Sequence, residues 1–273
     1  MLDLHCHLLP GIDDGARDLE TALAMARMAA ADGITAVACT PHIMPGVYNN
    51  NGPAIRKAIE QLQRAVADAG IPIRLLTGAD VHVAPDLASQ LRDGWALTIN
   101  NSRYFLLEPP HHVLPPRLED HIFSLQTAGY VPILTHPERL SWLDQHYDLI
   151  KRLVYSDVLM QLTAGSLTGR FGRRTRYWAE RMLDEGYCHL LATDAHDPVQ
   201  RAPLLAEARD HAARRLGPEQ ATHLVLTRPL GIVNDCSPAE LPQPAAALQS
   251  PAREQAPSTW RSIIERVRRV AVS

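Results

Sequence analysis

Four short polar signatures along the chain carry the residue types that bind divalent cations. They are His5-Cys6-His7, Thr40-Pro41-His42, Thr135-His136-Pro137-Glu138-Arg139 and Thr193-Asp194-Ala195-His196. Each follows a short, largely apolar run. Imidazole and carboxylate groups are common ligands of such cations, and a parallel α/β barrel brings the carboxyl ends of its strands to one rim. We therefore expect the four signatures to meet at one metal centre.

The first and last signatures each place two candidate ligands two residues apart. On a strand this spacing points both side chains to the same side, so His5 and His7 face one way while Cys6 faces the other. Asp194 and His196 repeat the spacing at the end of a later apolar run. Each pair can offer two donor atoms to one ion.

Further candidates follow the intervening apolar runs. Pro41 fixes a turn that is expected to aim His42 across the barrel mouth. Asp80 follows the third run, with His82 two residues later. Glu108 closes a wholly apolar run, and an isolated buried carboxylate is too costly to leave without a partner. Glu108 is therefore expected to be paired or to bind a cation.

The expected ligands offer only nitrogen and oxygen donors. They are His5, His7, His42, Asp80, Glu108, His136, Asp194 and His196. One ion uses about four to six ligands, so two or three ions that share carboxylates are expected, and Mn²⁺, Fe²⁺ and Zn²⁺ all fit. Neighbouring ions lower the pKa of a bridging water and polarise a phosphoryl oxygen. This chemistry predicts a metal-dependent phosphoesterase.

Charged residues beside these ligands are candidates for handling substrate. Arg139 and Arg201 are each expected to hold phosphate oxygens through the guanidinium group, with a salt bridge at the rim as the alternative. Asp13 and Asp14 lie between glycines after the first run, and one of them could protonate the leaving oxygen. Asp18 is expected to cap the helix that follows.

The predicted elements alternate between buried strands and amphipathic helices. The strands are expected over about 2–5, 34–40, 72–78, 104–108, 130–135, 158–163 and 188–193, and helices over 18–32, 55–69, 117–128 and 172–185. A glycine follows each of these helices. Right-handed crossovers would close such repeats into a distorted (β/α)7 barrel over residues 1–234. A doubly wound open sheet is the competing architecture.

Composition narrows the class of protein further. The chain has 273 residues, of which 46% are hydrophobic, and this content favours one large core. Its net charge is -3, which gives no reason to expect a nucleic-acid partner. A signal sequence and a membrane-spanning stretch of about 20 apolar residues are not expected. Four widely spaced cysteines predict reduced thiols in a cytoplasmic protein. The spacing C-x₅-R and the motifs G-x-x-x-x-G-K-[ST] and G-x-S-x-G are missing from the sequence, which excludes three other hydrolase mechanisms.

The C-terminal part of the chain differs in composition. Residues 235–257 are rich in proline and alanine and are interpreted as a linker. Residues 258–273 regain helical spacing, with apolar residues on one face and arginines on the others. This pattern predicts a surface helix packed on the barrel, or alternatively a helix that docks on an acidic partner or associates peripherally with a membrane.

Together these motifs resemble the PHP (polymerase and histidinol phosphatase) superfamily. The opening residues 3–15, DLHCHLLPGIDDG, are similar to those of the bacterial manganese-dependent protein-tyrosine phosphatases of capsule and exopolysaccharide loci, the CpsB/YwqE type. The four signatures, Leu107-Glu108 and Gly165-Ser166-Leu167-Thr168-Gly169 also match that family in order and spacing. The resemblance covers roughly residues 1–230.

The resemblance implies a three-metal centre, with Mn²⁺ as its metal, that hydrolyses phosphotyrosine on a bacterial tyrosine autokinase controlling capsule or exopolysaccharide synthesis. Carried over by position, Arg139 and Arg201 would hold phosphate and Asp14 would be the acid/base. The ligands it implies are His5, His7, His42, Glu108, His136, Asp194 and His196. Two other functions stay open: hydrolysis of a small ester such as histidinol phosphate or a sugar phosphate, and a catalytically weak, metal-bound regulator.

One position departs from the family pattern. The family usually has Gly-x-Glu after the third strand, whereas this chain has Gly78-Ala79-Asp80. Aspartate is shorter by one methylene, about 1.5 Å of reach, and carboxylate–metal bonds tolerate far less than that. The backbone must therefore approach the ion, or a water must intervene, with His82 as a possible substitute ligand.

Overall fold

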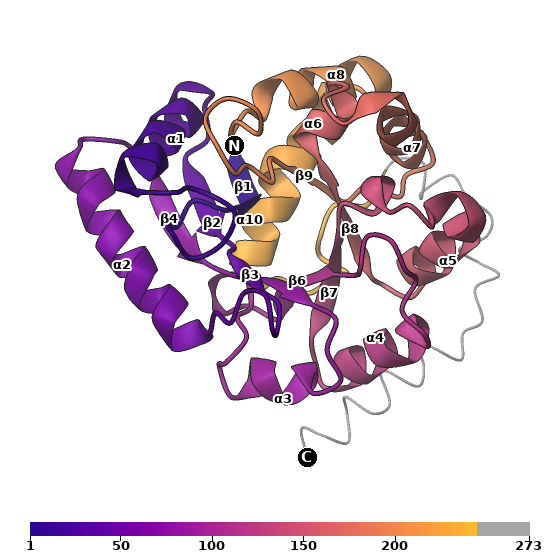
Figure 1. Cartoon of the computed structure of the whole chain (residues 1–273). Coiled ribbons are helices and arrows are strands. Elements are labelled where there is room, and N and C mark those ends of the chain that lie inside the picture. Colours follow the sequence, from indigo (N-terminus) through magenta and orange to yellow (C-terminus); the bar gives the residue numbers. More distant parts are fainter. Residues whose placement is uncertain (245–273) are drawn as a thin grey trace.

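The computed structural model describes residues 1–244, in which a ring of parallel strands is surrounded by helices (Figure 1). The strands are β1 (Leu2–Cys6), β2 (Ala36–Cys39), β3 (His42–Ile43), β4 (Arg74–Thr77), β5 (Asp80–His82), β6 (Tyr104–Glu108), β7 (Val131–Thr135), β8 (Leu159–Thr163) and β9 (Leu190–Ala192). The α-helices are α1 (Leu19–Ala31), α2 (Gly52–Asp68), α3 (Leu87–Arg92), α4 (Leu118–Thr127), α5 (Leu143–Tyr155), α6 (Ala164–Leu167), α7 (Gly172–Asp184), α8 (Ala206–Leu216), α9 (Pro218–Thr222) and α10 (Arg228–Val233). The short helices η1 (Ile99–Asn101), η2 (Pro137–Arg139) and η3 (His223–Thr227) complete the chain.

The strands follow one another around the ring in sequence order. One parallel ladder runs β1-β2-β4 and the other runs β3-β5-β6-β7-β8-β9. β3 continues β2 and β5 continues β4 after short interruptions, so the two ladders form one sheet. The ring closes where Cys6 bridges Ala195 and the Asp194 amide donates to the His5 carbonyl at 2.8 Å. The expected (β/α)7 barrel is therefore confirmed, and the doubly wound sheet is wrong.

Polarity increases along the barrel axis. Alternate residues of each strand point inward, and Tyr104 and Leu106 of β6 lie in the inner apolar cluster while Glu108 reaches the mouth. In β8, Leu159 belongs to that cluster and Gln161 lies above it. The intervening residues join the larger core between strands and helices. The barrel interior is thus apolar at the amino ends of the strands and polar at their carboxyl ends.

The amino-terminal end of the barrel is closed by α10 and the residues after it. Ile232 and Val233 belong to the inner cluster, and α10 lies behind the strands in Figure 1. Tyr104 donates to the Cys236 carbonyl at 2.7 Å, and Leu241 is buried. Residues 235–244, the first part of the expected linker, therefore lie against the barrel. The rest of the linker and the expected helix over 258–273 fall outside the described residues.

Local signals place the first two helices. Asp18 caps α1 as expected, because its carboxylate accepts from the Thr21 amide at 2.8 Å. α2 begins at Gly52, three residues before the expected start. The Asn51 side chain accepts from the Ala54 amide at 3.1 Å, and proline is well tolerated in a first turn. This cap moves the start of α2 toward the amino terminus.

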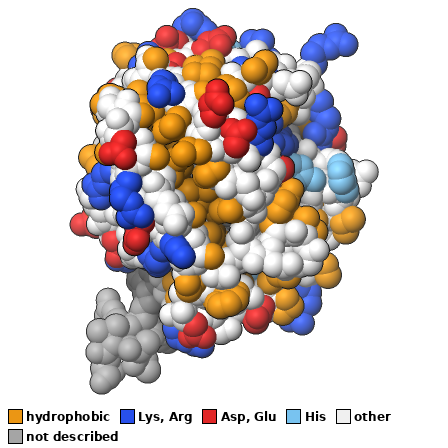
Figure 2. All heavy atoms as spheres, turned by 60° about the vertical axis from the view of Figure 1, so that its left-hand side comes forward, with side chains coloured by type: hydrophobic (Ala, Val, Ile, Leu, Met, Phe, Trp, Pro, Cys, Tyr) orange, Lys and Arg blue, Asp and Glu red, His pale blue; other side chains and the backbone are white. Residues whose placement is uncertain are grey.

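The surface mixes charge signs with apolar side chains. On the face in Figure 2, basic and acidic side chains are interspersed around a band of apolar ones. A mixture of both charges is typical of a solvated surface and gives no extended field of one sign. Within residues 1–244, none of the helices has the length and apolar character that a bilayer crossing requires.

Candidate metal centre

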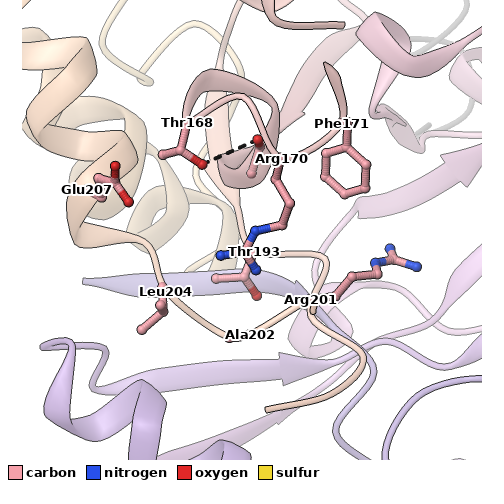
Figure 3. Close-up of a pocket in the computed structure, with 9 residues that line it drawn as sticks. Thr168, Arg170, Phe171, Thr193, Arg201, Ala202, Leu204 and Glu207 are labelled. Carbon is pink, nitrogen blue, oxygen red and sulfur yellow. Dashed lines mark hydrogen bonds between the residues drawn. The ribbon is translucent and has the colours of Figure 1, made fainter. Parts of the chain in front are cut away.

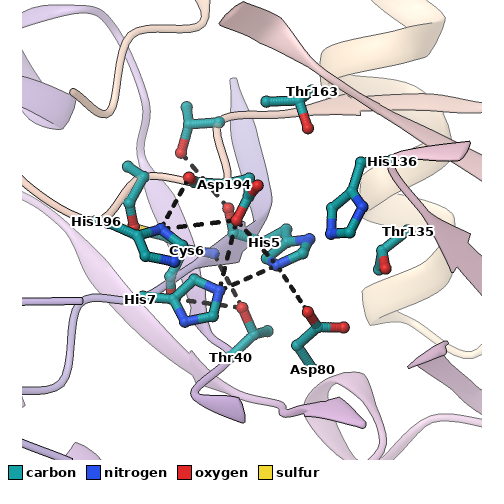
Figure 4. A network of polar contacts seen from close by, with 12 residues as sticks. His5, Cys6, His7, Thr40, Asp80, Thr135, His136, Thr163, Asp194 and His196 are labelled. Carbon is teal, nitrogen blue, oxygen red and sulfur yellow. Dashed lines mark hydrogen bonds and ion pairs between the residues drawn. The ribbon is translucent and has the colours of Figure 1, made fainter. Parts of the chain in front are cut away.

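The ends of β1 and β9 bring two histidines and two carboxylates together. The Nε2 atoms of His5 and His7 lie 3.2 Å apart, so both imidazoles face one point as expected. Asp194 Oδ1 is 3.4 Å from His5 Nε2 and 3.5 Å from His7 Nε2. Asp80 Oδ2 is 3.4 Å from His5 Nε2. Figure 4 shows these side chains pointing into one space from opposite sides of the barrel mouth.

His42 connects this group to two others. Its Nδ1 lies 3.3 Å from Glu108 Oε2 and 3.5 Å from Asp80 Oδ2. Its Nε2 lies 3.5 Å from Asp14 Oδ1, which is itself 3.4 Å from His196 Nε2. The donor atoms form four overlapping groups, in each of which all lie within 4.8 Å of one another: His7, Asp14, His42 and His196; His5, His7 and Asp80; Glu108, His111 and His136; His42, Asp80 and Glu108.

The spacing of the donor atoms distinguishes this cluster from ordinary ion pairing. Charge-assisted hydrogen bonds are about 2.7–2.9 Å long, whereas two ligands about 2.1 Å from the same ion lie roughly 3.0–3.5 Å apart. The inner separations of 3.3–3.5 Å between His5, His42 or His196 and their carboxylates match the second value. The residues present therefore fit shared cations.

Outer contacts, by contrast, are ordinary hydrogen bonds that orient the rings. His5 Nδ1 donates to Gln161 Oε1 at 2.8 Å, and His7 Nδ1 hydrogen-bonds Asp13 Oδ2 at 2.7 Å. His196 Nδ1 donates to the backbone carbonyl two residues before it, at 3.0 Å. Each partner engages Nδ1 and so leaves the Nε2 lone pair directed into the cluster, which is the usual arrangement around a ligating imidazole.

The electrostatics of the cluster favour added positive charge. Burial alone would lower the pKa of His5, but the charges of Asp194 and Asp80 outweigh it and raise the pKa to about 9. Burial would also lower the pKa of His42, but the carboxylates of Glu108 and Asp80 outweigh this effect and raise the pKa to about 10. Several buried donor atoms have no hydrogen-bond partner: His42 Nδ1, Asp80 Oδ1 and Oδ2, Glu108 Oε2 and His136 Nδ1. Divalent cations would satisfy both the charge and these atoms.

Two arginines approach the cluster from one side. Arg139 Nη1 and Arg201 Nη2 both donate to Asp194 Oδ2, the second at 2.5 Å. The Arg139 guanidinium lies 4.6 Å from the centre of the Phe171 ring and that of Arg201 6.0 Å from it. Arg201 Nε is buried and has no partner. Asp194 thus presents one oxygen to the histidines and the other to two cationic groups.

Two site residues adopt unusual backbone conformations. His136 has φ 35° and Asp194 has φ 49°, both in the left-handed region that non-glycine residues seldom adopt. His136 directly follows β7, and Asp194 lies in the turn after β9. Such strain of about 1–3 kcal/mol persists where the surroundings hold it and clusters at functional sites.

The two neighbouring aspartates in the loop after β1 have different environments. The Asp13 side chain is buried and accepts from the Gly15 amide at 2.9 Å and the His42 amide at 3.1 Å, in addition to its bond with His7. Asp14 is about half exposed and faces the cluster. Burial alone would raise the pKa of Asp14, but its contact with His196 and the nearby histidine charges outweigh it and lower the pKa. Asp14 therefore stays ionised.

A small pocket lies beside the arginines. Figure 3 shows Arg170, Phe171 and Arg201 along this pocket, with Glu207 on the opposite side. Arg170 is held by the Gln200 carbonyl at 2.8 Å. The complete lining is Gly165, Thr168, Arg170, Phe171, Thr193, Arg201, Ala202, Leu204 and Glu207. This pocket borders the cluster on the side where α6, α7 and α8 begin.

All eight residues predicted as ligands lie in this cluster. Two further residues of the cluster, His111 and Gln161, were not predicted from the sequence. His111 joins Glu108 and His136, three residues after the end of β6. Gln161 is a polar residue inside an otherwise apolar strand, a signal that could have identified it. His82 lies 3.8 Å from Glu108 Oε2 and belongs to none of the groups around Asp80.

The fold and the cluster together define a parallel α/β barrel with a candidate multinuclear metal centre at its carboxyl rim. A family model described as "Capsular polysaccharide synthesis, CpsB/CapC" matches residues 1–234. The tyrosine-protein phosphatase YwqE of Bacillus subtilis (strain 168) is 33% identical over 244 residues, which cover 89% of this chain and 96% of that protein. The putative tyrosine-protein phosphatase CapC of Staphylococcus aureus is 30% identical over 207 residues, covering 76% and 81%.

One solved structure agrees with these relatives. A chain from the crystal structures of YwqE from Bacillus subtilis and CpsB from Streptococcus pneumoniae, described as unique metal-dependent tyrosine phosphatases, matches with a TM-score of 0.83 at 32% identity. The match covers 90% of this chain and 99% of the other. The protein belongs to the CpsB/CapC family, which confirms the resemblance stated from the sequence.

Proposed function

We propose that this protein is a metal-dependent protein-tyrosine phosphatase, a phosphoric monoester hydrolase acting in capsule or exopolysaccharide synthesis. The observation that carries the proposal is the set of imidazole and carboxylate atoms 3.3–3.5 Å apart, with two guanidinium groups directly beside them. A phosphate monoester needs both an activated water and positive charge around its oxygens. Its relatives named as tyrosine-protein phosphatases support the choice of substrate.

The ligands proposed for two or three cations are His5, His7, His42, Asp80, Glu108, His136, Asp194 and His196. Mn²⁺ is the proposed metal because the resemblance to the manganese-dependent phosphatases implies it, and the nitrogen and oxygen donors of the cluster fit Mn²⁺, Fe²⁺ and Zn²⁺ alike. Bound cations would lower the pKa of a shared water and polarise the phosphoryl group. Asp80 reaches two histidines despite its short side chain because it lies directly opposite His42 in the parallel register.

The chain's own residues bind and orient the phosphate. Arg201 Nε is a donor without a partner, and Arg139 lies on the same side of Asp194, so both guanidinium groups can take phosphoryl oxygens. The Phe171 ring fixes their position from outside. Asp14 is the proposed acid/base: its ionised carboxylate accepts a proton from the attacking water and returns it to the leaving phenolate oxygen.

The proposed physiological substrate is the phosphotyrosine of a bacterial tyrosine kinase, and the proposed compartment is the cytoplasm. All four cysteines are free, and three of them are buried, which fits a reducing environment. Within the linker expected over 235–257, the part after residue 244 is proposed to connect the barrel to residues 258–273, a basic amphipathic segment for peripheral contact with an acidic partner or membrane.

Side-by-side turnover separates this function from its alternatives. A phosphotyrosyl peptide and histidinol phosphate are each assayed with metal-loaded protein, and release of inorganic phosphate is measured. We expect turnover of the peptide at least tenfold faster in kcat/KM. Hydrolysis of histidinol phosphate alone would favour a small-substrate phosphatase. Metal binding without hydrolysis of either substrate would favour a regulator.

A further inference from the structure

Glu108 is surrounded by four histidines, and two of them, His82 and His111, are not among the eight expected ligands. His42 lies 3.3 Å from its carboxylate, His111 lies 3.4 Å, His136 lies 3.7 Å and His82 lies 3.8 Å away. A carboxylate with so many nitrogen donors around it can serve more than one ion.

We infer that His111 is an additional metal ligand, which completes a site with Glu108 and His136. The donor atoms of these three residues lie within 4.8 Å of one another. His111 Nε2 is 3.4 Å from Glu108 Oε1, which is the separation of two ligands on one ion and too long for a good hydrogen bond. This inference rests on the proposed function, because it assumes that the centre binds divalent cations.

Hydrogen bonds hold the backbone of the loop at His111. Its carbonyl accepts from both the backbone amide and the hydroxyl of Ser141, at 2.9 and 3.0 Å. The Pro110 carbonyl accepts from the Trp142 indole at 3.0 Å. Pro109 and Pro110 restrict the chain between Glu108 and His111. The backbone that carries the imidazole is therefore held in place before any ion arrives, which lowers the cost of binding.

The group that contains His111 is distinct from the groups that contain Asp80. Asp80 serves the two groups that contain His5 and His42. The group of Glu108, His111 and His136 does not use Asp80. His111 thus supplies the third donor of this group, beside Glu108 and His136.

The test compares metal binding by His111→Ala with binding by the wild-type protein. His112→Ala is the matched control, since His112 is the exposed neighbour and belongs to none of the metal groups. Each protein is stripped with chelator, reloaded with Mn²⁺ and measured by elemental analysis and titration calorimetry. The visible spectrum of the Co²⁺-loaded form reports coordination directly. Circular dichroism checks that each variant is folded.

We expect His111→Ala to bind the weakest Mn²⁺ equivalent about 10–100-fold less tightly and to change the Co²⁺ spectrum, while His112→Ala matches wild type. Unchanged stoichiometry, affinity and spectrum in folded His111→Ala would overturn the inference and leave the proposed phosphatase intact. Wild-type protein that binds no metal would overturn both.

Discussion

The histidines of the centre compete for protons as well as metals. The raised pKa values of His5, about 9, and His42, about 10, mean that the metal-free protein carries a proton on each ring at neutral pH. Metal binding must displace these protons. When an imidazole is protonated in the metal-free protein and deprotonated in the metal-bound protein, metal affinity rises with pH. The rise ends once the pH exceeds the pKa of that imidazole in the metal-free protein.

We therefore predict that Mn²⁺ affinity rises by up to about tenfold per pH unit for each displaced proton between roughly pH 6 and pH 9. Titration calorimetry in two buffers of different ionisation enthalpy measures the number of protons released. A binding enthalpy that is identical in both buffers would show that no proton leaves, and would contradict this picture of the cluster.

The role of Asp14 can be separated from that of the ligands. Asp14→Asn removes the proton acceptor but leaves His7, His42 and His196 to hold their ion. We predict a fall in kcat of about 10²–10⁴-fold with metal content unchanged. Asp18→Asn, an exposed helix cap, is the control and should keep full kcat. Loss of one metal equivalent from Asp14→Asn would instead make Asp14 a ligand.

Several functional residues follow from the sequence because their positions at strand ends determine where they point. His5, His7 and Glu108 each lie at the carboxyl end of a parallel strand, and the barrel brings those ends together. His111 could not be predicted in this way, because its position depends on hydrogen bonds from Ser141 and Trp142, which follow another strand. Such contacts leave no periodic pattern in the sequence.

At the scale of elements, the seam between β1 and β9 joins the two signatures that share Asp194. The Asp3 carboxylate is fully buried and accepts from the Thr193 amide at 3.0 Å, the Thr193 hydroxyl at 2.5 Å and the His5 amide at 3.3 Å. Asp3 therefore fixes the first strand against the last and positions the ligands that follow both.

Asp3→Ala leaves these buried donors without an acceptor. We predict a loss of about 2–4 kcal/mol in the free energy of unfolding, measured by urea denaturation of the metal-free protein. Asp18→Ala, which removes an exposed cap, should cost only about 1 kcal/mol. Equal effects of the two substitutions would mean that the seam does not depend on Asp3.

The four helices that end at a glycine were predictable because an apolar stripe and a terminator coincide in the sequence. α5 and the helices after residue 205 were not predicted. α5 contains a non-helical residue, His146 (φ -127°), which interrupts its pattern, and α10 is only six residues long. α10 is placed by packing of Ile232 and Val233 into the barrel end, an interaction between distant parts of the chain.

At the scale of the whole molecule, metal binding and folding are linked. The ligands come from strands spread over residues 5–196, and bound ions would connect them all. Ligand present at about 100 times its Kd stabilises the folded state by about 2.7 kcal/mol. In a chain of this size, about 1 kcal/mol shifts Tm by roughly 2–4 °C.

Removal of metal with a chelator is therefore predicted to lower Tm by about 5–10 °C, and re-addition of Mn²⁺ should restore it. Scanning calorimetry provides the measurement, and Mg²⁺, which binds reluctantly to nitrogen ligands, serves as the comparison ion. A Tm that does not respond to chelation would mean that the ions do not connect the strands.

The most direct measurement is elemental analysis of the purified protein combined with phosphotyrosyl-peptide turnover before chelation, after it and after metal is restored. We predict two or three equivalents of a divalent transition metal per chain, loss of turnover on chelation and its recovery with Mn²⁺. Turnover that persists in protein free of metal would contradict this prediction.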